Sequence, residues 1–256
     1  MGDRYIVEQH SADFGCYVRS GESLVSTRTR YQDLEVVETS LFGRTLLLDH
    51  AFMTSDKDEF FYHENVVHVP AIAHSAPERA LIVGGGDGGA AKELVKHNTI
   101  QRIVLAELDE GVIEASRRLL ARVHQGVFDN PRLDLRVTDG KAYVEQTKER
   151  FDLIVLDLTD PIGPSQALYT REFYASCKRI LHEGGLLSLP AENPITRPQM
   201  FNRIVKTLAA EFRIVRPYLV YIPLWGTWWA LATASDETDP AELSEAEVER
   251  RIAARG

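Results

Sequence analysis

The sequence predicts an α/β fold in which a Rossmann-like sheet is preceded by a small N-terminal antiparallel β domain. Three observations predict it. Short β-prone runs separated by glycine turns fill residues 14–54, strand-like and helix-like segments alternate after Pro77, and a glycine-rich turn follows the first of these later strands. We therefore expect residues 1–75 to form the β domain with a connecting helix, and residues 76–256 to form the Rossmann-like domain.

The N-terminal strands are predicted from β-branched and aromatic runs on either side of the turns Ser20-Gly21 and Phe42-Gly43. The three strands are residues 16–18, 34–37 and 45–48. A helix over Lys57 to Val69 should follow, because apolar side chains recur there at helical spacing. Asp56 is its expected cap and Pro70 its expected end.

After Pro77 the chain repeats a strand and a helix, which favours a parallel sheet with helices on both faces. The predicted strands are residues 80–83, 102–108, 133–137, 151–156 and 185–189, and the predicted helices are residues 90–97, 111–123, 170–181 and 198–212. Residues 214–222 and 227–233 are expected to close the sheet as an antiparallel pair. A capped surface helix is expected after Asp239, with Pro240 at its first position.

Composition disfavours several classes of function. Lys and Arg number 29 against 38 Asp and Glu, so the net charge is −9. This charge, together with the lack of a basic block, disfavours a nucleic-acid partner and favours a small cation as the ligand. Cys16 and Cys177 are too few for a disulfide scaffold or a four-thiolate metal site. No basic-then-apolar leader follows Met1 and no apolar run approaches the roughly 18 residues of a membrane span. We expect a soluble, cytoplasmic protein with no membrane partner.

The glycine-rich turn, Gly84 to Gly89, is the sharpest local signal, because glycine lets the backbone turn tightly and approach a ligand closely. Its G-x-G-x-x-G pattern alone is weak, since dinucleotide binders and adenosyl-sulfonium binders share it. Asp87 inside the turn would repel a pyrophosphate and would suit a cationic ligand. The alternative is a purely structural turn in which Asp87 caps the next helix.

Two further acids follow predicted strands. Glu107 lies 18 residues after Gly89, about where an acid accepts the ribose hydroxyls in this fold, and Asp109 is a nearby competitor. A solvated surface acid is the alternative for either residue. Asp139 precedes Gly140 at the end of the third strand, where its carboxylate would suit an adenine amino group; a helix cap for the residues from Lys141 onward is an equally good interpretation.

Asp157 and Asp160 follow the fourth strand of the second region, at the edge where open α/β sheets bind ligands. A metal site is one interpretation, but no histidine or third acid accompanies them locally, and we predict no metal. A metal-free pair would grip a polyvalent ammonium group and take its proton. The alternative is an ordinary polar loop, with Asp160 starting a turn before Pro161.

Two other groups are less informative. His63 and His68 resemble a zinc-protease motif, but they are five residues apart instead of four and leave the same helical face. The aromatic residues Tyr221, Trp225, Trp228 and Trp229 are more typical of a core than of a cage for a cation.

Together these motifs resemble those of the polyamine aminopropyltransferase family, most closely its bacterial spermidine synthases. The resemblance extends over almost the whole chain. It rests on Tyr31-Gln32-Asp33, on Asp58 to Glu64, on Gly84 to Gly89, on Asp157 to Pro164 and on Leu168 to Tyr174. It implies a methyltransferase-type α/β domain after the β domain, and a homodimer.

The implied reaction moves the aminopropyl group of decarboxylated S-adenosylmethionine to putrescine, giving spermidine and methylthioadenosine. The sulfonium compound is a co-substrate, so no cofactor is expected. The resemblance implies that Asp157 is the general base. It also implies the two binding sets: Gln32, Asp87, Glu107, Asp139, Gly140 and Pro164 hold the nucleoside donor, and Tyr62, His63, Asp160 and Trp225 line the amine site.

Two positions depart from the family pattern. Met53 stands where glutamine is common, and Trp225 stands where a tyrosine that contacts the amine is common. These departures leave the acceptor open, so the same chemistry on another diamine or polyamine is an alternative. The sequence also leaves open an S-adenosylmethionine methyltransferase, which shares the fold, and a non-catalytic polyamine-binding protein. A nicotinamide oxidoreductase is the weakest interpretation, because Asp87 occupies the phosphate loop.

Overall fold

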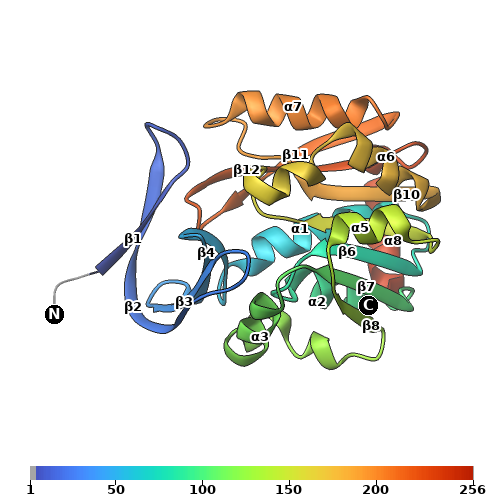
Figure 1. Ribbon diagram of the computed structural model, residues 1–256. Helices are drawn as coiled ribbons and strands as arrows, with labels where there is room; N and C mark the ends of the chain where they lie inside the picture. The colour runs from blue at the N-terminus through green and yellow to red at the C-terminus, as the bar shows by residue number, and fades with distance from the viewer. Residues whose placement is uncertain (1–3, 256) are drawn as a thin grey trace.

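The computed structural model describes residues 4–255, apart from the side chain of Pro164, and contains two sheets (Figure 1). The N-terminal sheet is antiparallel, with five strands in the order β1-β2-β3-β4-β5. The strands are β1 (Arg4–Gln9), β2 (Gly15–Arg28), β3 (Asp33–Thr39), β4 (Gly43–Leu48) and β5 (Ala51–Ser55). The predicted β domain is therefore confirmed, and β1 and β5 are additions to the three strands that the sequence indicates.

The second sheet has seven strands in the order β11-β12-β10-β9-β6-β7-β8. They are β6 (Arg79–Gly84), β7 (Arg102–Glu107), β8 (Leu133–Val137), β9 (Phe151–Asp157), β10 (Leu181–Pro190), β11 (Ile214–Ile222) and β12 (Thr227–Ser235). The first five are parallel, while β12 pairs antiparallel with both β10 and β11. This is the predicted Rossmann-like sheet closed by an antiparallel pair.

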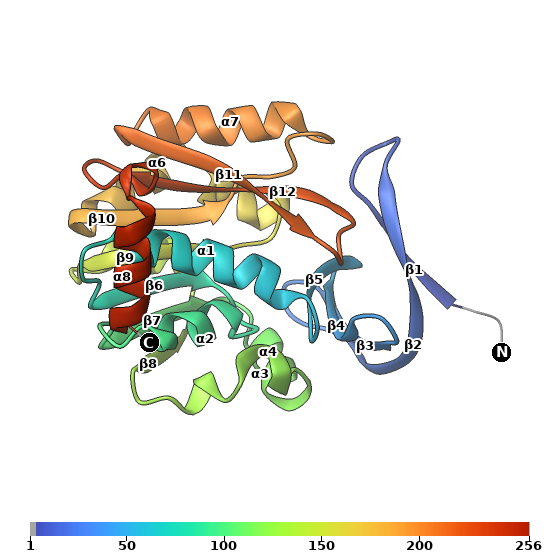
Figure 2. The same ribbon diagram turned by 180° about the vertical axis from the view of Figure 1, so that it is seen from behind.

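Helices cover both faces of the second sheet. α1 and α2 lie on one face and α5, α6 and α7 on the other, as Figures 1 and 2 show from the two sides. The helices are α1 (Glu59–Ala73), α2 (Gly89–Lys96), α3 (Glu110–Leu119), α4 (Ala121–His124), α5 (Gly140–Gln146), α6 (Arg171–Arg179), α7 (Pro198–Ala209) and α8 (Glu245–Arg255), with short 3-10 turns at η1 (Val127–Asp129), η2 (Gly163–Leu168) and η3 (Pro240–Glu242). No helix within residues 4–255 is long and apolar enough to cross a membrane.

Helix α1 differs from its prediction at both ends. It begins after Asp58, not after Asp56, because the Asp56 carboxylate accepts the Arg44 backbone N–H instead. It also continues through Pro70 to Ala73. A proline inside a helix leaves the carbonyl four residues earlier without its donor, and here the Ser188 hydroxyl of β10 donates to that Val66 carbonyl at 2.7 Å. The contact from the sheet therefore keeps α1 continuous.

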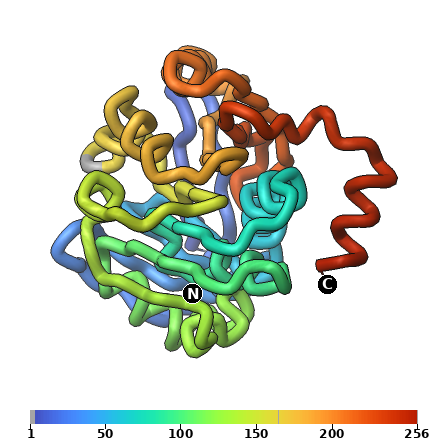
Figure 3. The backbone as a smooth tube through the Cα atoms, turned by 90° about the vertical axis from the view of Figure 1, so that its right-hand side faces the viewer, coloured from blue at the N-terminus to red at the C-terminus, as the bar shows by residue number. Residues whose placement is uncertain are grey.

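The predicted tail helix divides into η3 and α8, and α8 lies beyond α1 on the outside of the molecule (Figure 3). Two of its arginines, Arg251 and Arg255, face inward. Arg251 donates to the carbonyls of Ile72 and Ala73 at 2.8 and 2.7 Å, and Arg255 donates to the His74 carbonyl at 2.8 Å. The carbonyls at a helix C-terminus lack partners within the helix, so these cations cap α1. The division into residues 1–75 and 76–256 stays a prediction.

Candidate active site

The site begins where β6 and β9 end side by side, with Gly84 paired to Asp157. The Gly85 backbone N–H donates to the Asp157 carbonyl at 3.0 Å. Gly84 has a φ of +81°, and a Cβ on it would lie 2.2 Å from that same carbonyl oxygen. Only glycine fits this backbone, so the glycine-rich turn holds Asp157 at the carboxyl edge of the sheet, where parallel α/β sheets bind ligands.

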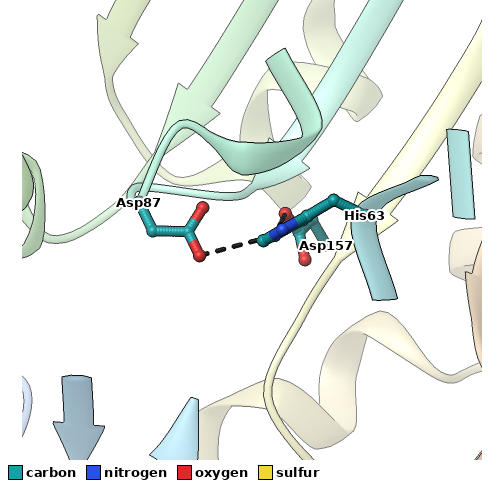
Figure 4. A group of neighbouring side chains, drawn as sticks. All are labelled: His63, Asp87 and Asp157. Atoms are coloured by element: carbon teal, nitrogen blue, oxygen red, sulfur yellow. Dashed lines mark ion pairs between the residues drawn. The ribbon is translucent and has the colours of Figure 1, made fainter. Parts of the chain in front are cut away.

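His63 enters the same space from α1 and lies between Asp87 and Asp157 (Figure 4). Its Nε2 atom is 3.5 Å from Asp87 Oδ2 and 3.9 Å from Asp157 Oδ2. A Cβ on Gly89 would lie 2.2 Å from His63 Cε1, so the glycine at the start of α2 makes room for the ring. The other Asp87 oxygen accepts the Gly89 N–H at 2.8 Å, a contact of the kind that the alternative interpretation expected, although the residue at the N-cap position of α2 is Gly88.

Burial and charge act in opposite directions in this group. Burial alone would lower the pKa of His63, but Asp87, Glu59 and Asp157 outweigh it and hold that pKa well above its ordinary range. Burial raises the pKa of Asp157 to about 6, with His63 opposing and Asp87 adding to the effect. The pKa of Asp87 is lowered in spite of its burial, because the His63 cation faces it. Of the two aspartates beside His63, Asp157 is thus the one better placed to exchange a proton near neutral pH.

The three groups would suit a small cation. One atom of each of His63, Asp87 and Asp157 lies within 4.8 Å of the other two. No local sequence pattern showed that His63 joins Asp87 and Asp157, because it lies on a distant helix; only the family resemblance placed it in the amine site. The two carboxylates attract a cation, and once the His63 ring has lost its proton the group matches either an ammonium group or a metal ion, so the prediction that no metal binds here stays a prediction.

Behind His63 lies a buried chain of charged side chains that sequence reasoning missed. Glu59 accepts a hydrogen bond from His63 Nδ1 at 2.8 Å, and Lys92 donates to the other Glu59 oxygen at 2.5 Å. Lys92 also lies 2.6 Å from Glu93, which in turn bonds His68 at 2.9 Å. Because Glu59 precedes His63 by four residues, helical spacing was the signal available for this pair.

A second set of charged residues lies near Asp160, and sequence reasoning missed most of it. The Asp160 carboxylate accepts from Arg197 at 2.9 Å, and Glu192 lies 3.4 Å from the same Arg197 nitrogen. Burial raises the pKa of both Glu8 and Glu192 to about 7, and Asp160 adds to each effect. Their positions depend on packing between the two sheets, and no local pattern indicates them. The Asp160 carbonyl also accepts the Ile162 N–H at 2.7 Å, which agrees with the turn of the alternative interpretation.

Comparison with known proteins decides the family. Residues 59–245 match the model described as the spermine/spermidine synthase domain, and residues 5–56 match the spermidine synthase tetramerisation domain. The chain belongs to the spermine/spermidine synthase family.

Two relatives illustrate the similarity within this family. A polyamine aminopropyltransferase of Nitrosomonas europaea is 50% identical over 256 residues, which cover 100% of this chain and 79% of that protein. One of Moorella thermoacetica is 40% identical over 237 residues, covering 92% and 83%. These relatives and the matched domain make the chain a polyamine aminopropyltransferase, which sets the methyltransferase and non-catalytic alternatives aside.

Solved structures agree with this assignment. A spermidine synthase in complex with the transition-state analogue AdoDATO matches with a TM-score of 0.92 and 32% identity, covering 99% of this chain and 92% of that one. Spermidine synthase from Thermotoga maritima matches with a TM-score of 0.86 and 32% identity, covering 93% and 82%. The predicted family and fold class are confirmed.

In this aminopropyltransferase, the residues predicted to bind the donor nucleoside extend from the glycine-rich turn toward the N-terminal sheet. Glu107 accepts the N–H groups of Gly86 and Asp109 at 3.1 and 2.8 Å, and burial raises its pKa to about 7. Gln32 donates to Asp109 at 3.0 Å. Asp109 is buried and caps α3 through the Gly111 N–H, so the alternative of a solvated acid is wrong for it.

The remaining donor residues lie on separate elements. Asp139 caps α5 by accepting the Lys141 N–H at 2.8 Å with one oxygen, as the alternative interpretation predicted. Gly140 has no room for a Cβ, which would lie 2.4 Å from Val83. Pro164 lies in η2, and its side chain is outside what the structure describes. The binding roles of these three residues stay predictions.

The residues predicted for the amine site lie on the other side of Asp157. The Tyr62 hydroxyl and Asp157 Oδ2 are buried, and neither has a hydrogen-bond partner among the described residues. Burial, followed by the Asp157 charge, raises the pKa of Tyr62 well above its ordinary range. Trp225 lies edge-on to Tyr62 at 5.9 Å, and its indole N–H donates to the Phe52 carbonyl at 2.9 Å. Met53 packs away from these rings, against the cluster between the N-terminal sheet and α3.

Proposed function

We propose that this aminopropyltransferase uses decarboxylated S-adenosylmethionine as its donor and putrescine as its acceptor, and that it produces spermidine and methylthioadenosine. The observation that supports this most directly is the Asp157 Oδ2 atom, which is buried at the ligand-binding edge of the sheet, has no hydrogen-bond partner among the described residues and faces the His63 ring only at 3.9 Å. A buried carboxylate oxygen without a hydrogen bond is costly, and an incoming ammonium group would reduce that cost.

We propose that Asp157 takes the proton of the attacking amine. An alkylammonium group has a pKa of about 10 and no lone pair, so it must lose a proton before it attacks. The neutral nitrogen then forms a bond to the aminopropyl carbon beside sulfur, and the carbon–sulfur bond breaks with its electron pair going to sulfur. The sulfonium becomes neutral methylthioadenosine, the product nitrogen becomes a secondary ammonium, and Asp157 keeps the first proton.

On the donor side, we propose that Asp87 binds the ammonium of the aminopropyl group. Asp87 would repel the carboxylate of ordinary S-adenosylmethionine, so the same contact selects the decarboxylated compound. Glu107 and Gln32 would hold the ribose. Asp139, Gly140 and Pro164 would hold the base.

On the acceptor side, we propose that Tyr62 and His63 position the attacking nitrogen and that Trp225 forms the apolar wall beside its methylene groups. The far ammonium would lie near Asp160, where Glu8 and Glu192 add negative charge. Two groups of acids, one around Asp157 and one around Asp160, suit the two charged ends of a diamine.

We also propose a homo-oligomer, for which the sequence predicts a dimer. The region matched to a tetramerisation domain holds β1 and β2, whose side chains Tyr5, Val7 and Tyr17 are 49%, 67% and 72% exposed. Exposed apolar clusters of this kind mark interaction surfaces. Light scattering on the purified protein would give the mass, and a monomer would contradict the proposal.

The test of the reaction is incubation of the protein with decarboxylated S-adenosylmethionine, with and without putrescine. Mass spectrometry should show methylthioadenosine and spermidine in equal amounts, and neither without putrescine. Release of methylthioadenosine without an aminopropylated amine would indicate hydrolysis and would contradict the proposal.

A further inference from the structure

Arg197 places a permanent cation in the acid-rich end of the candidate amine site. It directly precedes α7, and its guanidinium Nη1 atom donates to Asp160 at 2.9 Å and to Glu192 at 3.4 Å. Glu192 is almost fully buried, with a side-chain exposure of 1%. Arginine stays charged at every pH at which proteins fold, so these two carboxylates already face a cation before any amine binds.

The guanidinium is held from the N-terminal sheet as well. Arg197 Nε donates at 2.7 Å to the carbonyl of His10, just beyond β1. His10 is buried, and its ring stacks on Phe14 with centroids 5.7 Å apart. Arg197 therefore bridges the two sheets, and moving its guanidinium away would break hydrogen bonds on both sides.

One carboxylate of this group has no permanent cation against it among the described residues. Arg197 acts on Glu8 only through space, and the imidazole of His10, 3.8 Å from Glu8, has a pKa that burial lowers. Three acids, Glu8, Asp160 and Glu192, thus face a single fixed cation. Glu8 would attract one further ammonium group. A second ammonium group would have to occupy the space, and bind the carboxylates, that the Arg197 guanidinium already occupies and binds.

We propose that Arg197 is a specificity-determining residue, which occupies the cation position between Asp160 and Glu192 and thereby limits the acceptor to a diamine. This inference rests on the proposed function, because it concerns the acceptor of the same reaction. A triamine such as spermidine carries one more ammonium group than putrescine. That group would have to displace the guanidinium or lie next to it, and both are unfavourable.

The test is the ratio of kcat/KM for putrescine to kcat/KM for spermidine, measured in the wild type, in Arg197→Gln and in Arg197→Lys. The glutamine variant removes the charge and should shift the ratio toward spermidine by about tenfold or more, which corresponds to ~1.4 kcal/mol. The lysine variant keeps a cation and should keep the wild-type preference. Arg203→Gln, an exposed change on α7, is the matched control and should leave the ratio unchanged.

The outcomes separate this inference from the proposed function. If the wild type transfers no aminopropyl group to any diamine, the proposed function fails. If it uses putrescine and the ratio is unchanged in Arg197→Gln, the inference about Arg197 fails while the function stands. A wild type that uses spermidine as well as putrescine would also overturn the inference, and that result does not depend on whether the variants fold.

Discussion

Replacing Asp157 with asparagine should abolish most of the activity and leave the fold intact. The change preserves the shape of the side chain, so the contacts of the glycine-rich turn with the Asp157 backbone remain. A general base contributes about 10²- to 10⁴-fold to a rate, and kcat should fall by that factor. Donor binding should persist, because Asp87 and Glu107 are unchanged.

The effect on stability can be worked from the pKa. The pKa of Asp157 is raised from 3.8 to about 6, mainly by burial. Each tenfold change in an ionisation constant corresponds to ~1.4 kcal/mol, so keeping this carboxylate charged at neutral pH costs the fold up to about 3 kcal/mol. Asparagine carries no charge, so the free energy of unfolding of Asp157→Asn should be equal to or higher than that of the wild type.

The assay combines steady-state turnover, donor binding by calorimetry and urea unfolding on the same preparation. Asp129→Asn removes an exposed carboxylate, 85% accessible, and is the matched control; it should change none of the three. Activity near the wild-type level would refute the role of Asp157 as base. A loss of activity together with a loss of several kcal/mol of stability would show a structural role instead.

Three further predictions concern pH, Glu59 and the cap of α1. Because Asp157 must be ionised to accept a proton and its pKa is about 6, kcat/KM should fall as pH drops below about 6; a profile flat to about pH 5 would contradict this. Glu59→Gln leaves the buried Lys92 ammonium with one charged partner fewer and should lower the free energy of unfolding, measured in urea, by about 3 kcal/mol. The exposed Glu64→Gln on the same helix is the control and should lower it by about 0.5 kcal/mol or less; equal effects would refute the buried network. Arg255→Gln should cost about 1–3 kcal/mol by freeing carbonyls at the end of α1, with kcat unchanged; an unaltered melting curve would count against the cap.

The parallel sheet could be predicted from sequence because its signals are local. Apolar runs, glycine turns and helical spacing each lie within a few residues, and the carboxyl ends of β6 and β9 follow from the strand and turn pattern. The positions of Asp87, Glu107 and Asp157 near the ligand-binding edge therefore follow from the sequence as well. The five-stranded sheet was predicted less completely, since β1 and β5 lack a strong alternation of their own.

The rest depends on contacts between distant segments. The continuation of α1 past Pro70 needs the Ser188 hydroxyl, which lies on a strand more than a hundred residues later. The meeting of His63 with the aspartates depends on how α1 packs across the sheet. Arg197 contacts Asp160 while its Nε donates to the His10 carbonyl, which lies just beyond β1 in the N-terminal sheet. None of these contacts produces a repeating pattern of residues in the sequence, so an analysis of hydrophobic periodicity cannot predict them.

The most direct measurement is product analysis by mass spectrometry after one incubation with decarboxylated S-adenosylmethionine and an equimolar mixture of putrescine, cadaverine, agmatine and spermidine. We expect methylthioadenosine in an amount equal to that of newly formed spermidine, with the other amines largely unchanged. Formation of a different aminopropylated amine as the main product would contradict putrescine as the acceptor. The absence of any aminopropylated product, with the donor bound, would contradict the transfer reaction at this site.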